Sequence, residues 1–242
     1  MAMVEQVNHL NIGPILGNPK NRIARIGVEL EGGWRALPLG THLERDGSVF
    51  GDQGCPGFKV GELPIGPIQP AAMSKFMKKY YPHKVDSTCG MHVHMSFTSL
   101  RYYAILMVPE FQETMCEFLT LWAKEEGFEK GHHIWGRLQG KSNFCQKQFW
   151  PDEQVGYKRK DHDQNRNGHR YTIVHYCGRQ NTIEIRVLPM METVEQAIRG
   201  VKRVLDITNA SLVVLANREK KVNDRLVIAD GEVYEDFIEE KL

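Results

Sequence analysis

Polar side chains recur at every second position in three short apolar stretches of the chain. Each stretch holds one pair of chemically active residues two positions apart: Glu29 and Glu31, His92 and His94, and Glu184 and Arg186. Side chains of a strand alternate between its two faces, so residues at i and i+2 project from the same face of a sheet. The pattern therefore predicts three strands, each of which presents its polar pair on one face.

Turn residues mark the ends of the first predicted strands. Residues 24–31 form the first strand, which we expect to end at Gly32 and Gly33. The stretch 45–70 is rich in Gly and Pro and predicts a hairpin or a long loop. This segment leads into a short strand, KVGELPIG, which carries Glu62.

Two further strands are expected in close succession, at 170–177 and 181–189. The three residues between them, 178–180, begin with Gly and are typical of a hairpin. Strands and helices do not alternate one for one along the chain, and the links between strands resemble hairpins. The predicted class is therefore α+β, with an antiparallel sheet and helices on one face.

Two helices are predicted between the first strands and the last. Pro70 can begin the first helix, which we expect to end before Pro82. The second follows Pro109, and its apolar residues recur at helical spacing: Phe111, Met115, Phe118, Leu119 and Trp122. Spacing of this kind is typical of a helix that packs against a core.

The longest predicted helix follows the last strand. Thr193 and Gln196 have the form of a capping box, and the helix is expected to run to about Arg218. Its apolar positions predict a core helix packed on a sheet. Residues 222–242 suggest one more hairpin or an acidic tail. The segment 131–168 shows no periodic pattern and predicts a long loop, a feature that is often functional.

The composition is that of an ordinary globular protein. The chain has 242 residues, of which 41% are hydrophobic and 25% are charged, and its net charge is +1. No linker rich in Pro, Gly and Ser divides it, so we expect one domain over residues 1–242. The near-neutral charge argues against a dedicated nucleic-acid binder. A locally basic stretch, 157–175, fits a polyphosphate site and a solvated loop equally well.

Cysteine usage and hydropathy favour a cytoplasmic protein without membrane contact. The five cysteines are widely spread: Cys55, Cys89, Cys116, Cys145 and Cys177. Their odd number and the lack of Cys-x-x-Cys spacing are typical of reduced thiols rather than of disulfides or a zinc finger. The N-terminus lacks the basic start and apolar core of a signal peptide. No apolar run reaches about 18 residues, the length that a spanning helix needs.

The residue types in the polar pairs indicate a metal site. One Glu-x-Glu or His-x-His pair alone fits the solvated face of a strand about equally well. Repetition among metal-binding residue types favours a site, and its expected ligands are Glu29, Glu31, Glu62, His92 and Glu184. Four carboxylates and one imidazole suit two or more Mg or Mn ions rather than a structural zinc.

Ions of this kind mostly bridge phosphate oxygens in enzymes. Arg170 and Arg186 would then neutralise the charge of a phosphoryl group as it transfers. The sequence therefore predicts phosphoryl transfer from a nucleotide.

Five short motifs, taken in their order along the chain, resemble a known family. They are GVELE at 27–31, DGS at 46–48 with GELP at 61–64, GMHVH at 90–94, RY at 170–171, and TIEIR at 182–186. Two of them resemble the Gly-Met-His-x-His-x-Ser and Ile-Glu-x-Arg strands of glutamine synthetases. The whole series is similar to the amidoligase family, small members of the glutamine synthetase and glutamate–cysteine ligase superfamily. The similarity spans about residues 24–190.

The resemblance implies a glutamine synthetase-like catalytic domain, with a curved antiparallel sheet that carries the active site and helices on its other face. It implies that Glu29, His92 and Glu184 share one ion. Glu31 and Glu62 are then expected to share the other ion.

The same resemblance implies roles for the neighbouring polar residues. His94 and Ser96 are expected to lie toward the nucleotide. Arg170 and Arg186 are expected to face the phosphates or an acyl-phosphate intermediate, and with Glu62 they form the expected catalytic set.

The reaction that the resemblance implies joins a carboxylate to an amine. ATP phosphorylates the carboxylate, and the amine then attacks the acyl phosphate to give an amide or isopeptide bond, with Mg or Mn as the metal. The acceptor could be an amino acid, a peptide, a cell-wall precursor, a modified nucleobase or a protein. Two alternatives remain open: a phosphotransferase of the guanidino-kinase type, and a nucleotide- or metal-binding module without turnover.

Overall fold

The structure is a computed structural model that describes most of the chain. The described residues are 22–51, 54–63, 72–97, 99, 101–143, 145–147, 171–177 and 181–230, with the backbone alone described for 218–230. The elements, in chain order, are β1 (Ile23–Trp34), β2 (Lys59–Leu63), α2 (Met73–Tyr80), β3 (Gly90–Phe97), α3 (Arg101–Leu106), α4 (Pro109–Glu125), α5 (Ile134–Leu138), β4 (Lys141–Ser142), β5 (Cys145–Gln146), β6 (Val174–Cys177), β7 (Thr182–Pro189) and α7 (Val194–Asp230).

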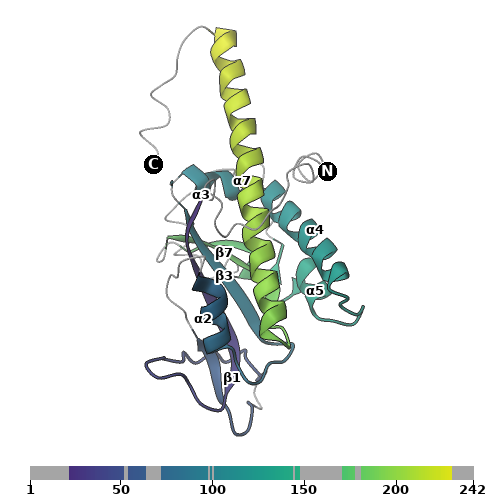
Figure 1. Cartoon of the computed structure of the whole chain (residues 1–242). Helices are drawn as coiled ribbons and strands as arrows, with labels where there is room; N and C mark the ends of the chain where they lie inside the picture. Colours follow the sequence, from purple (N-terminus) through teal and green to yellow (C-terminus); the bar gives the residue numbers. More distant parts are fainter. Residues whose placement is uncertain are drawn as a thin grey trace.

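A five-stranded sheet organises the described residues, with the strand order β2-β1-β3-β7-β6. Every neighbouring pair in this sheet is antiparallel. Helix α7 lies across the sheet, with α2, α3 and α4 beside it (Figure 1). A mixture of helices and antiparallel strands confirms the predicted α+β class. Within the described residues, no helix is both long and apolar enough to cross a membrane.

The apolar residues that alternate with the polar residues along the strands form the core of the sheet. Four of them are completely inaccessible to solvent: Val28, Leu30, Val93 and Ile185. Burying an aliphatic side chain of this size stabilises a fold by about 1.5–3 kcal/mol. A Cβ atom added at Gly200 of α7 would lie 3.5 Å from Leu188 of β7 and 3.1 Å from Trp122 of α4. Helix α7 therefore packs directly on the sheet, and this contact leaves the polar pairs on the opposite face.

A break in register between β3 and β7 lies beside the polar pairs. Met91 pairs with Leu188, whereas Val93 pairs with Ile185, so two steps along β3 correspond to three along β7. Arg186 and its following residue thus both lie opposite a single β3 residue, as in a β-bulge. Bulges commonly redirect a side chain next to a functional site.

The first strand does not end where the sequence predicted. Gly32 and Gly33 belong to β1, which continues to Trp34. The amide of Gly33 donates to the carbonyl of Lys84 at 2.9 Å. A Cβ atom on Gly32 would lie 2.6 Å from the Cβ of Pro82. These glycines therefore allow another backbone to approach the strand closely. In a sequence, glycines with this role look the same as glycines that end a strand.

Most other predicted elements are present. The strand with Glu62, the α2 and α4 helices, and the antiparallel pair β6 and β7 are all confirmed. The five apolar residues of the α4 stripe are buried. The predicted helix start at Pro70 and the turn at 178–180 lie outside the described residues.

Two predictions in the second half of the chain are wrong. Helix α7 runs to Asp230 rather than to about Arg218, so residues 222–230 are helical and not part of a hairpin or tail. The sequence contains no Gly or Pro between Gly200 and Gly231 that would end the helix earlier.

The second wrong prediction concerns the long loop at 131–168. This segment contains α5 and the small β4–β5 hairpin, while residues 148–168 lie outside the described residues. Elements of five and two residues are too short to produce a visible periodicity.

A glycine in β2 generates the first testable prediction. Gly61 has φ +155°, and a Cβ atom there would lie 2.1 Å from the carbonyl oxygen of Glu44. Glu44 and Glu62 exchange two backbone hydrogen bonds of 2.9 Å at this point. We expect Gly61→Ala to lower the free energy of unfolding by about 2–4 kcal/mol, measured by urea denaturation.

The matched control for this substitution is Gly47→Ala. A Cβ atom at Gly47 meets nothing within 4 Å. We expect its unfolding free energy to stay within about 0.5 kcal/mol of the parent protein. Equal stabilities for the two variants would contradict the account of the Gly61 contact.

Candidate metal centre

The pairing register of the sheet brings the predicted ligands together. Glu31 lies opposite Glu62, and Glu29 lies opposite His92. His94 in turn lies opposite Glu184. Residues directly opposite each other in an antiparallel pair share a face, with Cβ atoms about 4.5–5.5 Å apart. The predicted ligands therefore form a continuous row across four strands, on one face of the sheet.

The first group in this row consists of Glu29, His92 and Glu184. The Nδ1 atom of His92 lies 3.1 Å from a carboxylate oxygen of Glu29 and 3.3 Å from one of Glu184. One ligand atom from each residue lies within 4.8 Å of the others. The sequence analysis expected these three residues to share one ion, and the structure places them together.

The second group consists of Glu31, Asp46 and Glu62, whose ligand atoms also lie within 4.8 Å of one another. Asp46 is not among the ligands that the sequence predicts, although it lies in the DGS motif at 46–48. One of its oxygens accepts hydrogen bonds from the amide and the hydroxyl of Ser48, at 2.8 and 2.6 Å. The backbone bridge between Glu44 and Glu62 carries this turn to the sheet.

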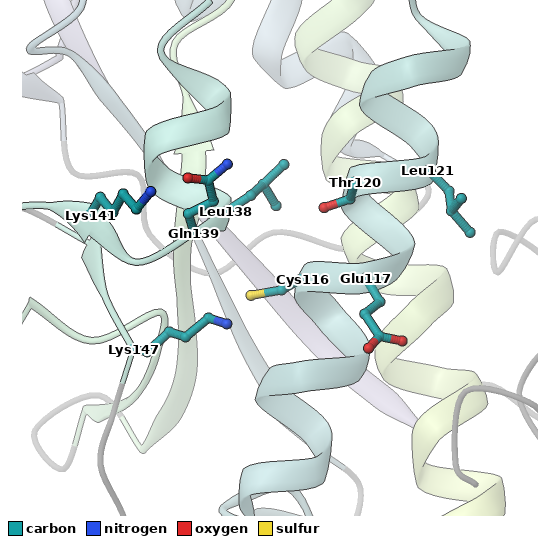
Figure 2. A pocket seen from close by; sticks show the side chains of 8 residues that line it. All are labelled: Cys116, Glu117, Thr120, Leu121, Leu138, Gln139, Lys141 and Lys147. Atoms are coloured by element: carbon teal, nitrogen blue, oxygen red, sulfur yellow. The ribbon is translucent and has the colours of Figure 1, made fainter. Parts of the chain in front are cut away.

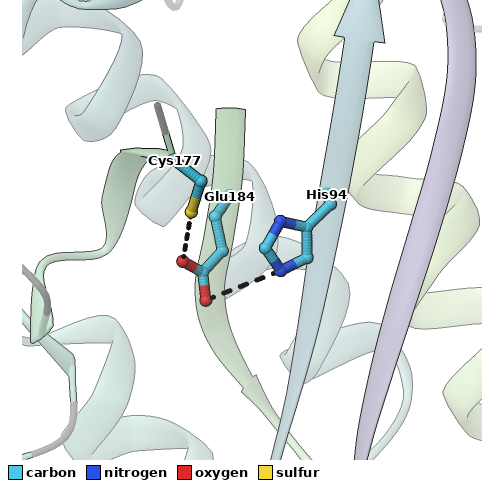
Figure 3. A group of neighbouring side chains, drawn as sticks. All are labelled: His94, Cys177 and Glu184. Carbon is cyan, nitrogen blue, oxygen red and sulfur yellow. Dashed lines mark hydrogen bonds and ion pairs between the residues drawn. The ribbon is translucent and has the colours of Figure 1, made fainter. Parts of the chain in front are cut away.

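A third group shares Glu184 with the first and adds Cys177 of β6 and His94 of β3. The Cys177 thiol donates to Glu184 Oε2 at 3.1 Å, and His94 Nε2 lies 3.8 Å from Glu184 Oε1 (Figure 3). Burial and the negative charge of Glu184 raise the pKa of the thiol above its usual value. Sequence reasoning treated Cys177 only as one of several reduced thiols, because its spacing matches no metal motif.

Two buried arginines lie beside the carboxylates. Arg186 forms an ion pair with Glu184. Arg137 of α5 is 2% exposed and donates to the backbone carbonyl of Arg186 at 3.3 Å. A Cβ atom on Gly90 would lie 3.1 Å from an oxygen of Glu31 and 3.2 Å from a guanidinium nitrogen of Arg137. Arg137 thus belongs to the site, and no pattern in its aperiodic segment could have identified it.

Positive neighbours keep two of the carboxylates charged despite their burial. Burial opposes the charge of Glu29, yet the hydrogen bond with His92 and the close His94 imidazole hold its pKa well below the usual value. Burial likewise opposes the charge of Glu184, but Arg186, His92 and His94 hold its pKa below the usual value. Burial lowers the pKa of His94, and the adjacent carboxylates of Glu29 and Glu184 raise it by more.

Glu62 shows that negative charge is in excess at the other end of the row. Burial, and then repulsion by Glu29, Glu31 and Asp46, raises the pKa of Glu62 to about 8. An ordinary glutamate would be charged at neutral pH. The second group therefore holds more carboxylates than its protein surroundings can keep ionised.

The donor set fits hard divalent ions. In the described part of the chain, the first two groups combine five carboxylates with one imidazole. The carboxylates are Glu29, Glu31, Asp46, Glu62 and Glu184. Oxygen-rich sets of this type suit Mg or Mn. A bound ion would neutralise the excess negative charge that raises the pKa of Glu62.

Two predicted site residues remain, Ser96 and Arg170. Ser96 is half-buried on β3, two positions beyond His94. Arg170 lies outside the described residues.

Two cavities are lined by described residues other than the predicted site residues. One, of about 600 Å³, lies between α4 and the β4–β5 hairpin, where Lys141 and Lys147 approach it opposite Thr120 and Cys116 (Figure 2). Another, of about 710 Å³, is lined by residues that include His132 and His133. Neither cavity is lined by a predicted site residue.

Comparison of the chain with models of protein families, with curated protein sequences and with solved structures gave no match.

The shifted pKa of Glu62 predicts a pH-dependent stability in metal-free protein. The folded state binds this proton more tightly than the unfolded state, since the pKa rises from 4.5 to about 8 on folding. The contribution to stability is complete below pH 4.5 and is lost as the pH rises through about 8. Glu62→Gln cannot lose the proton, so we expect its stability relative to the parent to increase between about pH 5 and pH 9.

Urea denaturation in the presence of a chelator, repeated across this pH range, measures the difference. Glu113→Gln, on the exposed side of α4, is the control and should show no trend of this kind. A stability difference between Glu62→Gln and the parent that stays constant with pH would contradict the assignment.

Proposed function

We propose that this protein is an ATP-dependent carboxylate–amine ligase with a glutamine synthetase-like catalytic domain of the amidoligase type. The observation that carries the proposal is the alignment of two groups of hard ligands along one face of an antiparallel sheet. Those ligands stand in the same order along the chain as the motifs of that family. The coincidence of motif order with spatial grouping supports a dinuclear phosphoryl-transfer site.

Each group would hold one ion in this proposal. Glu29, His92 and Glu184 would bind the first, and Glu31 and Glu62 the second, with Asp46 as an additional ligand. Bound Mg or Mn would neutralise and polarise the phosphate oxygens of ATP.

The other polar residues of the face would bind the transferring group. Arg186 has a buried Nε donor that finds no acceptor among the described residues, and a phosphate oxygen would satisfy it. His94, with its raised pKa, would present a positive charge to the nucleotide phosphates. Ser96 lies further along the same strand on the same side. Arg170 keeps the phosphate-binding role that the resemblance implies.

The proposed reaction has two transfers. A carboxylate oxygen attacks the γ-phosphorus of ATP, the bond to the bridging oxygen breaks, and ADP leaves. An amine nitrogen then attacks the acyl carbon, the carbon–oxygen bond to phosphate breaks, and the nitrogen loses a proton. Arg186 and His94 act in both steps by stabilising charge on the phosphoryl oxygens. The protein positions the reactants and excludes the competing attack of water.

Hydroxylamine provides a direct test because it is a general amine that traps acyl phosphates as hydroxamates. Purified protein with Mg and ATP is incubated with a panel of amino acids, peptides and cell-wall precursors as carboxylate donors. We expect ADP and a hydroxamate in equal amounts, and only when a productive carboxylate is present. Glu184→Ala and Glu184→Gln should lower the rate by at least about 100-fold, since each removes a carboxylate ligand of the ion that would neutralise the reacting phosphate.

Glu113→Ala, on the exposed side of α4, controls for the loss of a glutamate elsewhere and should keep the parent rate. Unchanged turnover in both Glu184 variants would contradict the proposal. A stable phosphorylated product without any hydroxamate would instead indicate a guanidino-kinase type of phosphotransferase. ATP binding without turnover on any donor would indicate a binding module.

A further inference from the structure

The sheet face carries a sulfur ligand beside the hard-ion groups. Cys177 lies on β6, opposite Thr182 of β7, and its thiol donates to Glu184 Oε2 at 3.1 Å. Figure 3 shows the Cys177 sulfur and the His94 ring on either side of the Glu184 carboxylate. Ligand atoms of these three residues lie within 4.8 Å of one another.

The His94 ring is oriented as in a metal-binding histidine. Its Nδ1 atom lies 3.0 Å from the hydroxyl of Thr182, which fixes the ring and turns Nε2 toward the carboxylates. Nε2 lies 2.9 Å from Glu29 Oε1 and 3.8 Å from Glu184 Oε1. The contact with Glu29 is a close ion pair without hydrogen-bond alignment, so the Nε2 lone pair or proton is not committed to a hydrogen bond with a described residue, and the side chain is almost fully buried. A second hydrogen bond that orients the ring is typical of histidines that bind metals.

The donor set of this third group differs from that of the other two. It combines one sulfur, one imidazole nitrogen and one carboxylate oxygen, whereas the other groups hold no sulfur. Soft and borderline ions such as Zn²⁺ prefer thiolate and imidazole, while Mg²⁺ prefers oxygen. Among the described residues, no other cysteine belongs to such a group.

We propose that His94, Cys177 and Glu184 form a separate binding site for a thiophilic divalent ion of the Zn²⁺ class. When the ion binds, the Sγ–H bond breaks, an Sγ–metal bond forms and the proton leaves to solvent, without any transfer of electrons to the ion. The site is defined by these three side chains alone and does not depend on the ligase reaction.

Occupation of this site has a consequence for the neighbouring group. Glu184 belongs both to the Cys177 group and to the Glu29–His92 group. An ion bound to Cys177 therefore draws Glu184 away from the hard ion, and thiophilic ions act as inhibitors of Mg- or Mn-dependent turnover. This regulatory part rests on the proposed function.

Cobalt tests the site, because a thiolate bound to Co²⁺ gives a charge-transfer band in the near ultraviolet and an oxygen ligand does not. Reduced, metal-free protein is titrated with Co²⁺. We expect this band in the parent and in Cys55→Ser, a change at a cysteine outside all three groups. Cys177→Ser and Cys177→Ala should lose the band, and stoichiometric Zn²⁺ should abolish it in the parent.

Thr182→Val tests whether the oriented histidine contributes. It removes the hydroxyl next to His94 Nδ1 and should weaken Zn²⁺ binding by about 10-fold or more while the cobalt band remains. A parent protein that binds Co²⁺ without the band would overturn the proposal. So would a band that persists unchanged in both Cys177 variants.

Bound Mn²⁺, followed by electron paramagnetic resonance, tests the competition for Glu184 without any substrate. We expect Zn²⁺ to release Mn²⁺ from the parent at a concentration about 10-fold or more below that needed for Cys177→Ser. If the same Zn²⁺ concentration released Mn²⁺ from the parent and from Cys177→Ser, the proposed competition for Glu184 would be wrong. A cobalt band without hydroxamate formation would reject only the ligase proposal, and hydroxamate formation without the band would reject only the third site.

Discussion

The register between β1, β3 and β7 is the constraint on which the site depends. It sets Glu29 opposite His92 and His94 opposite Glu184, and it pairs Val28 with Val93, both completely buried. Because side chains alternate along a strand, a slip of one residue would move every ligand into the apolar core. The free energy that buries the core residues therefore also holds the ligands on their face. The same register of β1, β3 and β7 therefore produces both the packed core and the polar face.

The main electrostatic cost of this arrangement is the excess of carboxylates. Arg186 offsets the charge of Glu184, and the histidines stabilise the charge of Glu29. Glu62, at the end of the row, has a pKa raised to about 8 because burial and neighbouring carboxylates oppose its ionisation. Buried negative charge of this kind destabilises the folded state unless a cation binds nearby. In the proposed function, divalent ions at the two hard-ligand groups would supply that charge.

The strands and most ligands could be predicted from the sequence because period-2 alternation is a local property. Asp46 and Arg137 could not be assigned in this way. Asp46 reaches the ligands only through the backbone bridge between Glu44 and Glu62, and Arg137 lies on a helix of one and a half turns that has no visible period. Cys177 lies beside Glu184 because of the β6–β7 register, which its spacing in the sequence does not reveal. The positions of Asp46, Arg137 and Cys177 beside the candidate ligands thus depend on contacts between segments that are distant in the sequence.

The most direct measurement is the anomalous scattering of Mn²⁺ in crystals of the protein. The account predicts one manganese peak among Glu29, His92 and Glu184, and a second among Glu31, Asp46 and Glu62. Manganese peaks confined to other parts of the molecule, or no peak at saturating Mn²⁺, would contradict the claim that this sheet face is a dinuclear metal centre.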